Sequence, residues 1–128
     1  MSLNGYILSI DQGTTSSRAL ILDHQGNIIV QKNYEFAQYF PHDGWVEHNP
    51  LEILKTTKDA VNFILNEKNI NPKEISVAGI TNQRETIVAW NKQTGQPVYN
   101  SIVWQDRRTE TFCEELRNKK FTNLIHTQ

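Results

Sequence analysis

The chain has 128 residues, of which 38% are hydrophobic and 21% charged, and its formal net charge is -1 at neutral pH. These values are typical of one soluble globular domain, which buries about two thirds of the surface that its unfolded chain exposes. The balance of 13 basic and 14 acidic residues excludes a general nucleic-acid partner, because such proteins carry excess positive charge to neutralise phosphates.

A single cysteine and four scattered histidines restrict the chemistry further. Cys113 has no partner for an internal disulfide, and a structural zinc site requires a full set of Cys or His ligands. No apolar run approaches the roughly 18 residues of a membrane-spanning helix, and the first residues lack the features of a secretory signal. We therefore expect a protein without a membrane span in the reducing cytoplasm.

The first third of the chain predicts an antiparallel meander of three strands. Residues 6–11 and 18–23 are short apolar runs rich in branched side chains, and a third strand begins at residues 28–30 and runs toward Phe36. Turn-forming residues at 24–27 separate the second strand from the third. Residues 38–49 have no periodicity and predict a loop.

A helix and a returning strand follow. Asn49 is expected to cap the helix with Pro50 at its first position, and Glu52 is placed to reach back toward the cap. The helix should end near Asn69, because Pro72 cannot continue it. Its core-facing stripe is predicted to contain Ile53, Thr57, Ala60, Val61 and Ile64. Residues 75–81 then predict a buried strand that crosses back into the same sheet.

The last part of the chain predicts a second hairpin and a final helix. Residues 86–90 and 98–99 flank a turn at 91–95, and the helix is expected from about residue 107 to residue 119. These elements predict an α/β domain with a mixed sheet. The chain stops at the apolar Leu124 and Ile125 without a closing element, so we expect it to be incomplete.

Residues 11–18 join the first two strands and are the first candidate site. Hydroxyl groups, a permissive Gly13, the cation Arg18 and the acid Asp11 together suit a nucleotide phosphate with its metal. The alternative is an ordinary polar hairpin turn. The spacing excludes a Walker A loop, and the scattered glycines exclude the dinucleotide fingerprint.

Two further segments carry candidate residues. Arg84 and Glu85 follow a strand and could bind the hydroxyls of a polyol, although an exposed ion pair would look the same. In a purely structural interpretation, Trp104 is an aromatic residue of the core and Asp106 is the N-cap of the last helix. Two arginines in a first helical turn oppose its dipole by about 0.3 to 1 kcal/mol each, which favours a negatively charged neighbour or ligand.

At these residues the sequence resembles the glycerol kinase branch of the FGGY carbohydrate kinases, within the superfamily of actin, hexokinase and heat-shock ATPases. Residues 11–18 are similar to the family's first phosphate motif, and residues 44–48 to an early loop. Residues 79–85 resemble its substrate segment, and residues 102–109 the segment that follows. Asp106 departs from the pattern, because some members have Cys there. The resemblance runs from Tyr6 onward without obvious gaps.

The resemblance implies a ribonuclease H-like mixed sheet that forms a partial first lobe of a two-lobe kinase. Residues 1–128 would be an incomplete N-terminal domain, and the second, adenine-binding lobe would be absent. The resemblance also implies ATP and Mg²⁺ as cofactors and glycerol as the substrate that is phosphorylated to glycerol 3-phosphate. A homo-oligomer is expected for the full-length form.

Residue roles follow from the resemblance by position. Asp11 would lie by the metal, directly or through water. Arg84 and Glu85 would hydrogen-bond the hydroxyls of glycerol, and Trp104 would pack on its carbon chain. The ATP phosphates would be bound by four residues of the first motif, Thr14, Thr15, Ser16 and Arg18.

No catalytic residue is assigned in this chain. The family's general base is an Asp in a segment that the chain lacks, and a base must lie within hydrogen-bond reach to act. We therefore expect the isolated chain to be inactive. Two alternatives are another FGGY kinase with a related polyol or sugar, and a noncatalytic truncated module that binds nucleotide weakly or associates with other chains.

Overall fold

The computed structural model describes residues 5–119, and four of its strands form one mixed sheet. The strands are β1 (Tyr6–Gln12), β2 (Ser16–Leu22), β3 (Ile28–Glu35) and β5 (Ile75–Thr81), in the spatial order β3-β2-β1-β5. The first three pair antiparallel, and β5 pairs parallel with β1. The predicted meander, crossover and α/β class are therefore confirmed.

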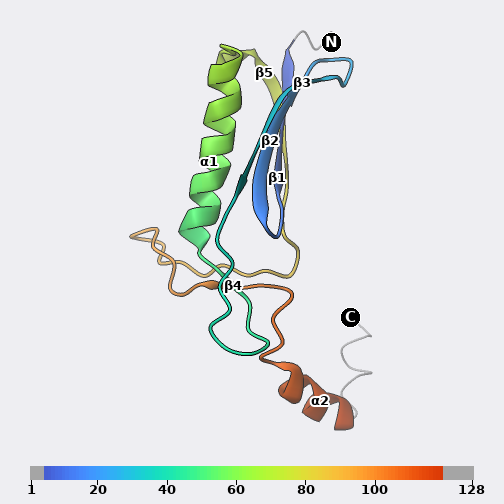
Figure 1. Cartoon of the computed structure of the whole chain (residues 1–128), viewed down its shortest axis with the longest axis vertical. Helices are drawn as coiled ribbons and strands as arrows, with labels where there is room; N and C mark the ends of the chain where they lie inside the picture. The colour runs from blue at the N-terminus through green and yellow to red at the C-terminus, as the bar shows by residue number, and fades with distance from the viewer. Residues whose placement is uncertain (1–4, 120–128) are drawn as a thin grey trace.

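Helix α1 (Pro50–Glu67) lies along one face of this sheet (Figure 1). Its Ala60 and Ile64 are buried, as the predicted stripe required, and share a core with Leu8 of β1 and with Ala19 and Ile21 of β2. Burying an aliphatic side chain of this size stabilises a fold by about 1.5 to 3 kcal/mol. This core therefore fixes α1 against the sheet.

The N-terminus of α1 has the predicted cap but not the predicted capping box. The side chain of Asn49 accepts a hydrogen bond from the backbone of Leu51 at 3.0 Å. Glu52 does not reach back to the cap; its carboxylate accepts hydrogen bonds from the backbone of Ala37 and the hydroxyl of Tyr39. Donors in the preceding loop therefore take the side chain that local spacing assigned to the cap.

The C-terminus of α1 is a Schellman motif, in which the helix ends at Glu67, shortly before the predicted Asn69. The backbone of Asn69 donates to Asn66 and that of Ile70 donates to Leu65. Asn69 adopts the left-handed conformation, with φ of 50°. The chain leaves the helix with Ile70 buried and enters a 3₁₀ turn, Pro72–Glu74.

Strand β5 was predicted to be buried, and this prediction is wrong. Val77 is 48% exposed and Ile80 is 74% exposed. The reason is that β5 pairs with β1 alone, while α1 packs mainly on β2 and β3. Within the described residues β5 is thus an edge strand whose apolar side chains remain uncovered.

The predicted loop at residues 38–49 contains a short strand, β4 (Glu47–His48), which pairs antiparallel with β6 (Ser101–Ile102). The predicted second hairpin is reduced to one bridge, Trp90 with Pro97, around the turn. Because β4 and β6 pair across a long stretch of sequence, local patterns missed both strands.

Helix α2 (Glu110–Asn118) begins three residues later than predicted. Its N-cap position is Thr109, which makes no side-chain cap bond, so the assignment of Asp106 as N-cap is wrong. Leu124 and Ile125, from which we expected an incomplete domain, lie outside the described residues. No helix between residues 5 and 119 is long and apolar enough to cross a membrane.

The left-handed conformation of Asn69 gives the first prediction. Asn69→Ala is expected to lower the free energy of unfolding by about 1 kcal/mol relative to Asn69→Gly, because this conformation strains every side chain with a Cβ and spares glycine. Urea unfolding followed by circular dichroism measures the difference. Lys68→Ala, at the neighbouring position with negative φ, is the control and should change little. Equal stability of the Ala and Gly variants would contradict the prediction.

Candidate functional site

The parallel pairing of β1 with β5 brings two candidate segments to one edge of the sheet. Asp11 pairs in register with Thr81, so both strands end at the same level. The turn after β1 and the segment after β5 therefore emerge side by side, at the end nearer β4 in Figure 1. This edge holds the candidate site.

The turn between β1 and β2 is tightly held. The backbone N–H of Gly13 donates to the carbonyl of Ser16 at 2.9 Å, and a Cβ on Gly13 would lie 3.2 Å from that oxygen. The carbonyl oxygen of the Gln12 side chain accepts from the hydroxyls of Ser17 at 2.8 Å and Thr57 at 2.7 Å. Thr57 belongs to α1, so the helix that forms the core also fixes the turn.

Two clefts meet at Asp11. The first has a volume of about 570 Å³ and is lined by Asp11, Gly13, Ser16, Arg18, Gln31, Lys32 and Asn33. The second has a volume of about 410 Å³ and is lined by Asp11, Gln12, Gly13, Thr14, Asn82, Gln83, Arg84, Glu85 and Trp104. The structure thus brings Thr14 and the three expected polyol-binding side chains into one cleft. Asp11 also lines the first cleft, together with Ser16 and Arg18.

The first cleft is rich in groups that suit an anion. Arg18 donates to the carboxylate of Asp11 at 2.6 Å, and both side chains remain substantially exposed, at 48% and 35%. An exposed pair of this kind contributes little to stability. The guanidinium retains further N–H donors, and the Ser16 hydroxyl and Lys32 lie in the same cleft. Thr15 is exposed and lines neither cleft.

Arg84 and Glu85 are exposed at the mouth of the second cleft, directly after the buried Gln83. The two charges form no ion pair with each other in the described part of the chain. Glu85 has a φ of 59°, in the left-handed region. This conformation costs a residue other than glycine about 1 to 3 kcal/mol. Such strained residues are concentrated at binding and catalytic sites.

Trp104 belongs to the wall of the second cleft that faces the turn at Thr14. It is 54% exposed, so the alternative of a core aromatic is wrong. Its indole Nε1–H donates to the hydroxyl oxygen of Thr14 at 3.1 Å, and its backbone N–H donates to the hydroxyl of Thr86 at 3.3 Å. The indole is therefore tied to the β1–β2 turn, 90 residues away in sequence.

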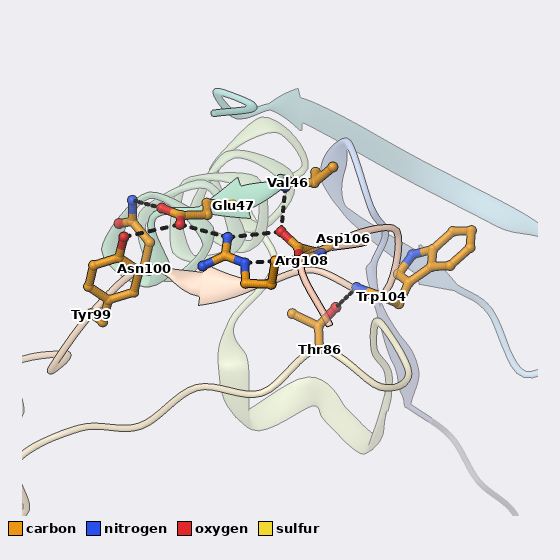
Figure 2. A network of polar contacts seen from close by, with 8 residues as sticks. All are labelled: Val46, Glu47, Thr86, Tyr99, Asn100, Trp104, Asp106 and Arg108. Atoms are coloured by element: carbon orange, nitrogen blue, oxygen red, sulfur yellow. Dashed lines mark hydrogen bonds and ion pairs between the residues drawn. The ribbon is translucent and has the colours of Figure 1, made fainter. Parts of the chain in front are cut away.

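A buried ionic cluster supports this wall, and Figure 2 shows Arg108 at its centre. We call Glu47, Asp106 and Arg108 the Arg108 cluster. The guanidinium lies 2.8 Å from the carboxylates of both Glu47 and Asp106, and it stacks 3.7 Å above the ring of Trp45. The prediction placed the two arginines in the first turn of the last helix, but both precede α2, so the argument from the helix dipole does not apply. Arg108 nevertheless has negatively charged neighbours, which are the carboxylates of Glu47 and Asp106.

The remaining oxygens of the cluster are also bonded. Glu47 accepts from the hydroxyl of Tyr99 at 3.1 Å and from the amide of Asn100 at 3.0 Å, and Asp106 accepts from the backbone of Val46 at 2.7 Å (Figure 2). Glu47 lies 61 residues from Arg108 in the sequence, so no local pattern indicates that they pair. The cluster joins β4, which contains Glu47, to the segments before and after β6.

The cluster shifts the ionisation of its members. Burial of Glu47 opposes its charge, but hydrogen bonds from Arg108, Asn100 and Tyr99 outweigh burial and hold its pKa below the ordinary value. Burial also opposes the charge of Asp106, and hydrogen bonds from Arg108 and from backbone N–H groups lower its pKa. The pKa of Arg108 is raised, first by its bond to Asp106 and then by its bond to Glu47.

Comparison with known sequences places the chain in a family. Residues 6–127 match the N-terminal domain of the FGGY family of carbohydrate kinases. The glycerol kinase of Thermoanaerobacter sp. strain X514 is 53% identical over 120 residues, which are 94% of this chain and 24% of that protein. The glycerol kinase of Mycoplasma mycoides subsp. mycoides is 58% identical over 109 residues, which are 85% of this chain and 22% of that protein.

Solved structures agree with this assignment. The crystal structure of Plasmodium falciparum glycerol kinase with ADP has a TM-score of 0.80 at 39% identity, over 89% of this chain and 23% of that one. The xylulose kinase of Lactobacillus acidophilus has a TM-score of 0.84 at 21% identity, over 94% of this chain and 24% of that one, and shows the shared fold.

The fold is that of the actin-like ATPases, represented here by about a quarter of the length of the relatives. The chain belongs to the FGGY family of carbohydrate kinases. It corresponds to a small N-terminal part of the glycerol kinases that it matches.

The Arg108 cluster gives the second prediction. Arg108→Met leaves two buried carboxylates without their cation, so it should lower the free energy of unfolding at pH 7 by about 3 kcal/mol or more. Because the native pKa values of Glu47 and Asp106 lie below their ordinary values, the cluster stabilises the fold above about pH 4 and this stabilisation is lost as the pH falls further. The difference between wild type and variant should therefore shrink in urea unfolding between about pH 5 and pH 3. The control is Arg117→Met on the exposed end of α2, and a difference that does not change with pH would contradict the account.

Proposed function

We propose that residues 1–128 form an incomplete N-terminal kinase domain, and that the whole protein transfers the γ-phosphate of ATP to glycerol, giving glycerol 3-phosphate and ADP. The observation that carries this proposal is the second cleft, in which Thr14, Arg84, Glu85 and Trp104 lie together beside Asp11. The match to glycerol kinases at 50% to 58% identity supports the choice of glycerol. The adenine-binding lobe belongs to parts of the whole protein outside this chain.

The second cleft offers complementary groups to a small polyol. The guanidinium of Arg84 only donates hydrogen bonds, whereas the carboxylate of Glu85 only accepts them. Neighbouring hydroxyl groups can therefore be bound in opposite senses, which fixes the orientation of the polyol. The indole of Trp104 presents an apolar surface on which the carbon chain packs. This combination favours a substrate with adjacent hydroxyls and an exposed hydrocarbon edge.

The ATP phosphates are assigned to the turn and the first cleft. Hydroxyl and backbone donors would come from Thr14, Thr15 and Ser16, and Arg18 would add a planar cation that matches phosphate oxygens. Because the indole of Trp104 donates to the Thr14 oxygen, the hydroxyl hydrogen of Thr14 is directed elsewhere and is available to a ligand.

Asp11 suits a magnesium ion that arrives with the nucleotide. Mg²⁺ is commonly held by one or two carboxylates together with substrate phosphates. No group of three or more His, Cys, Asp or Glu side chains among residues 5–119 could hold a metal ion by itself, so phosphate oxygens would complete the site. When bound, Mg²⁺ would neutralise charge on the transferred phosphoryl group. Arg18 donates a hydrogen bond to the Asp11 carboxylate at 2.6 Å.

We assign no general base to this chain. The acidic side chains of the second cleft are Asp11, which is bonded to Arg18, and Glu85, which is assigned to substrate binding. The base is accordingly proposed to come from another segment of the whole protein, and the isolated chain is expected to be inactive. The cytoplasmic location and the homo-oligomeric state of the whole protein stay predictions.

Acceptor preference gives the third prediction. With MgATP, the whole protein should phosphorylate glycerol with a higher kcat/KM than ribitol, xylulose or gluconate. The isolated chain should show no ATP turnover with glycerol above background. Coupled detection of ADP measures both. A preference for a sugar would favour another FGGY kinase, and activity of the isolated chain would refute the assignment of the base to another segment.

Truncation of Arg84 gives the fourth prediction. Loss of a hydrogen bond from a charged donor costs about 1.5 to 3 kcal/mol, so Arg84→Ala in the whole protein should lower kcat/KM for glycerol by about tenfold to a hundredfold. Most of the loss should appear as a higher KM for glycerol, with the KM for ATP little changed. Arg117→Ala, which removes the same charge from α2 away from both clefts, is the matched control. An unchanged KM for glycerol would exclude Arg84 from the polyol site.

A further inference from the structure

A closed ring of hydrogen bonds connects the two walls of the second cleft. Its six members come from four separate segments, and we call it the cleft ring: Thr14, Gln38, His48, Gln83, Thr86 and Trp104. The ring begins at the backbone carbonyl of Thr14 and returns to the hydroxyl of the same residue. The two sides of the ring can be followed separately, and they meet at the imidazole of His48.

The first side fixes one nitrogen of the imidazole. The side-chain NH₂ of Gln38 donates to the carbonyl of Thr14 at 3.3 Å and to the carbonyl of Phe36 at 3.4 Å. Both partners are acceptors only, so the amide oxygen of Gln38 must face His48. This oxygen lies 2.6 Å from Nε2 of His48, and therefore Nε2 must carry a hydrogen.

The second side fixes the other nitrogen. The backbone N–H of Trp104 donates to the hydroxyl oxygen of Thr86, whose own hydrogen is donated to the amide oxygen of Gln83 at 3.1 Å. The NH₂ group of Gln83 then points at Nδ1 of His48, at 3.4 Å. With the Gln83 amide in this orientation its NH₂ group donates, so Nδ1 accepts and lacks a hydrogen.

The surroundings of His48 favour the same neutral form. Its side chain is fully buried, and the edge of the Phe36 ring packs against it with centroids 5.1 Å apart. Burial lowers the pKa of His48, which opposes protonation. An imidazolium would place an N–H group at Nδ1 against the NH₂ group of Gln83 and break the ring at this point.

We propose that His48 is a positioning residue for the polyol site, held as the neutral Nε2–H tautomer, and that through the cleft ring it sets the distance between the Thr14 turn and the Gln83–Trp104 wall. Arg84 directly follows Gln83, and the indole of Trp104 closes the ring on Thr14. The ring thus reaches both walls of the cleft. His48 does not line the cleft, so it acts on the polyol site only through the other members of the ring. This proposal rests on the proposed function for its substrate.

The tautomer is tested by nuclear magnetic resonance on the whole protein labelled with ¹⁵N-histidine. Long-range ¹H–¹⁵N spectra distinguish the two neutral tautomers and the imidazolium, and the signal of His48 is identified by its loss in His48→Gln. We expect the Nε2–H form at pH 7, and still at pH 6, where an ordinary imidazole with a pKa of about 6.5 is mostly protonated. The Nδ1–H form, or an imidazolium at pH 7, would overturn the proposal.

The positioning role is tested by a pair of substitutions that differ in one hydroxyl. Thr86 is only partly buried, so Thr86→Val removes the link between Trp104 and Gln83 while keeping the shape of the side chain. This variant should raise the KM for glycerol by about fivefold or more and change kcat by less than about twofold. Thr86→Ser keeps the hydroxyl and should behave as wild type.

A third variant connects Thr86 to His48. His48→Leu should raise the KM for glycerol as Thr86→Val does, and the double variant should resemble the stronger single one, because both break the same ring. The proposal would be overturned if the double variant raised the KM for glycerol by the product of the two single effects. An effect on kcat alone, or equal kinetics of Thr86→Val and Thr86→Ser, would also overturn it. If the whole protein does not phosphorylate glycerol, the proposed function fails, whereas the tautomer of His48 still reports on the ring.

Discussion

The parallel pairing of β1 with β5 is the constraint on which the site depends. With Asp11 opposite Thr81, the turn that begins after β1 and the segment that begins after β5 leave the sheet at one level. An antiparallel partner would have sent the second segment to the opposite end. The crossover through α1 makes the parallel pairing possible, and the buried contacts of Ala60 and Ile64 hold that crossover against the sheet.

Beyond the sheet, polar contacts rather than apolar burial hold the site together. In residues 36–48 and 83–108 the buried apolar side chains are Phe36 and Val103, whereas Glu47, His48, Gln83 and Ser101 are buried polar ones. The Arg108 cluster and the cleft ring supply the bonds that Glu47, His48 and Gln83 need, because an unpaired buried polar group costs about 1 to 3 kcal/mol. Within the described residues the buried hydroxyl of Ser101 is the exception, since it has no hydrogen-bond partner. These directional contacts fix orientation more narrowly than apolar contacts do, which suits segments that must present ligands.

Sequence patterns predicted the elements whose signals are local. The apolar runs of β1 to β3, the Asn49 cap and the stripe on α1 depend on neighbouring residues, and each of these predictions is confirmed. The pairing of β4 with β6, the exposure of β5 and the partner of Glu52 depend on contacts distant in sequence, and no local pattern specifies them. The same distinction applies to the site: the motif residues were recognised, but Glu47, Gln38 and His48 act through partners far along the chain.

A crystal structure of the whole protein with glycerol and ADP tests the central claim most directly, because it shows whether the two segments gathered by β1 and β5 form the polyol site. The account predicts glycerol in the second cleft, with its hydroxyls within hydrogen-bond distance of Arg84 and Glu85 and its carbon chain against Trp104. Glycerol bound elsewhere, with these three side chains free of ligand, would contradict the account.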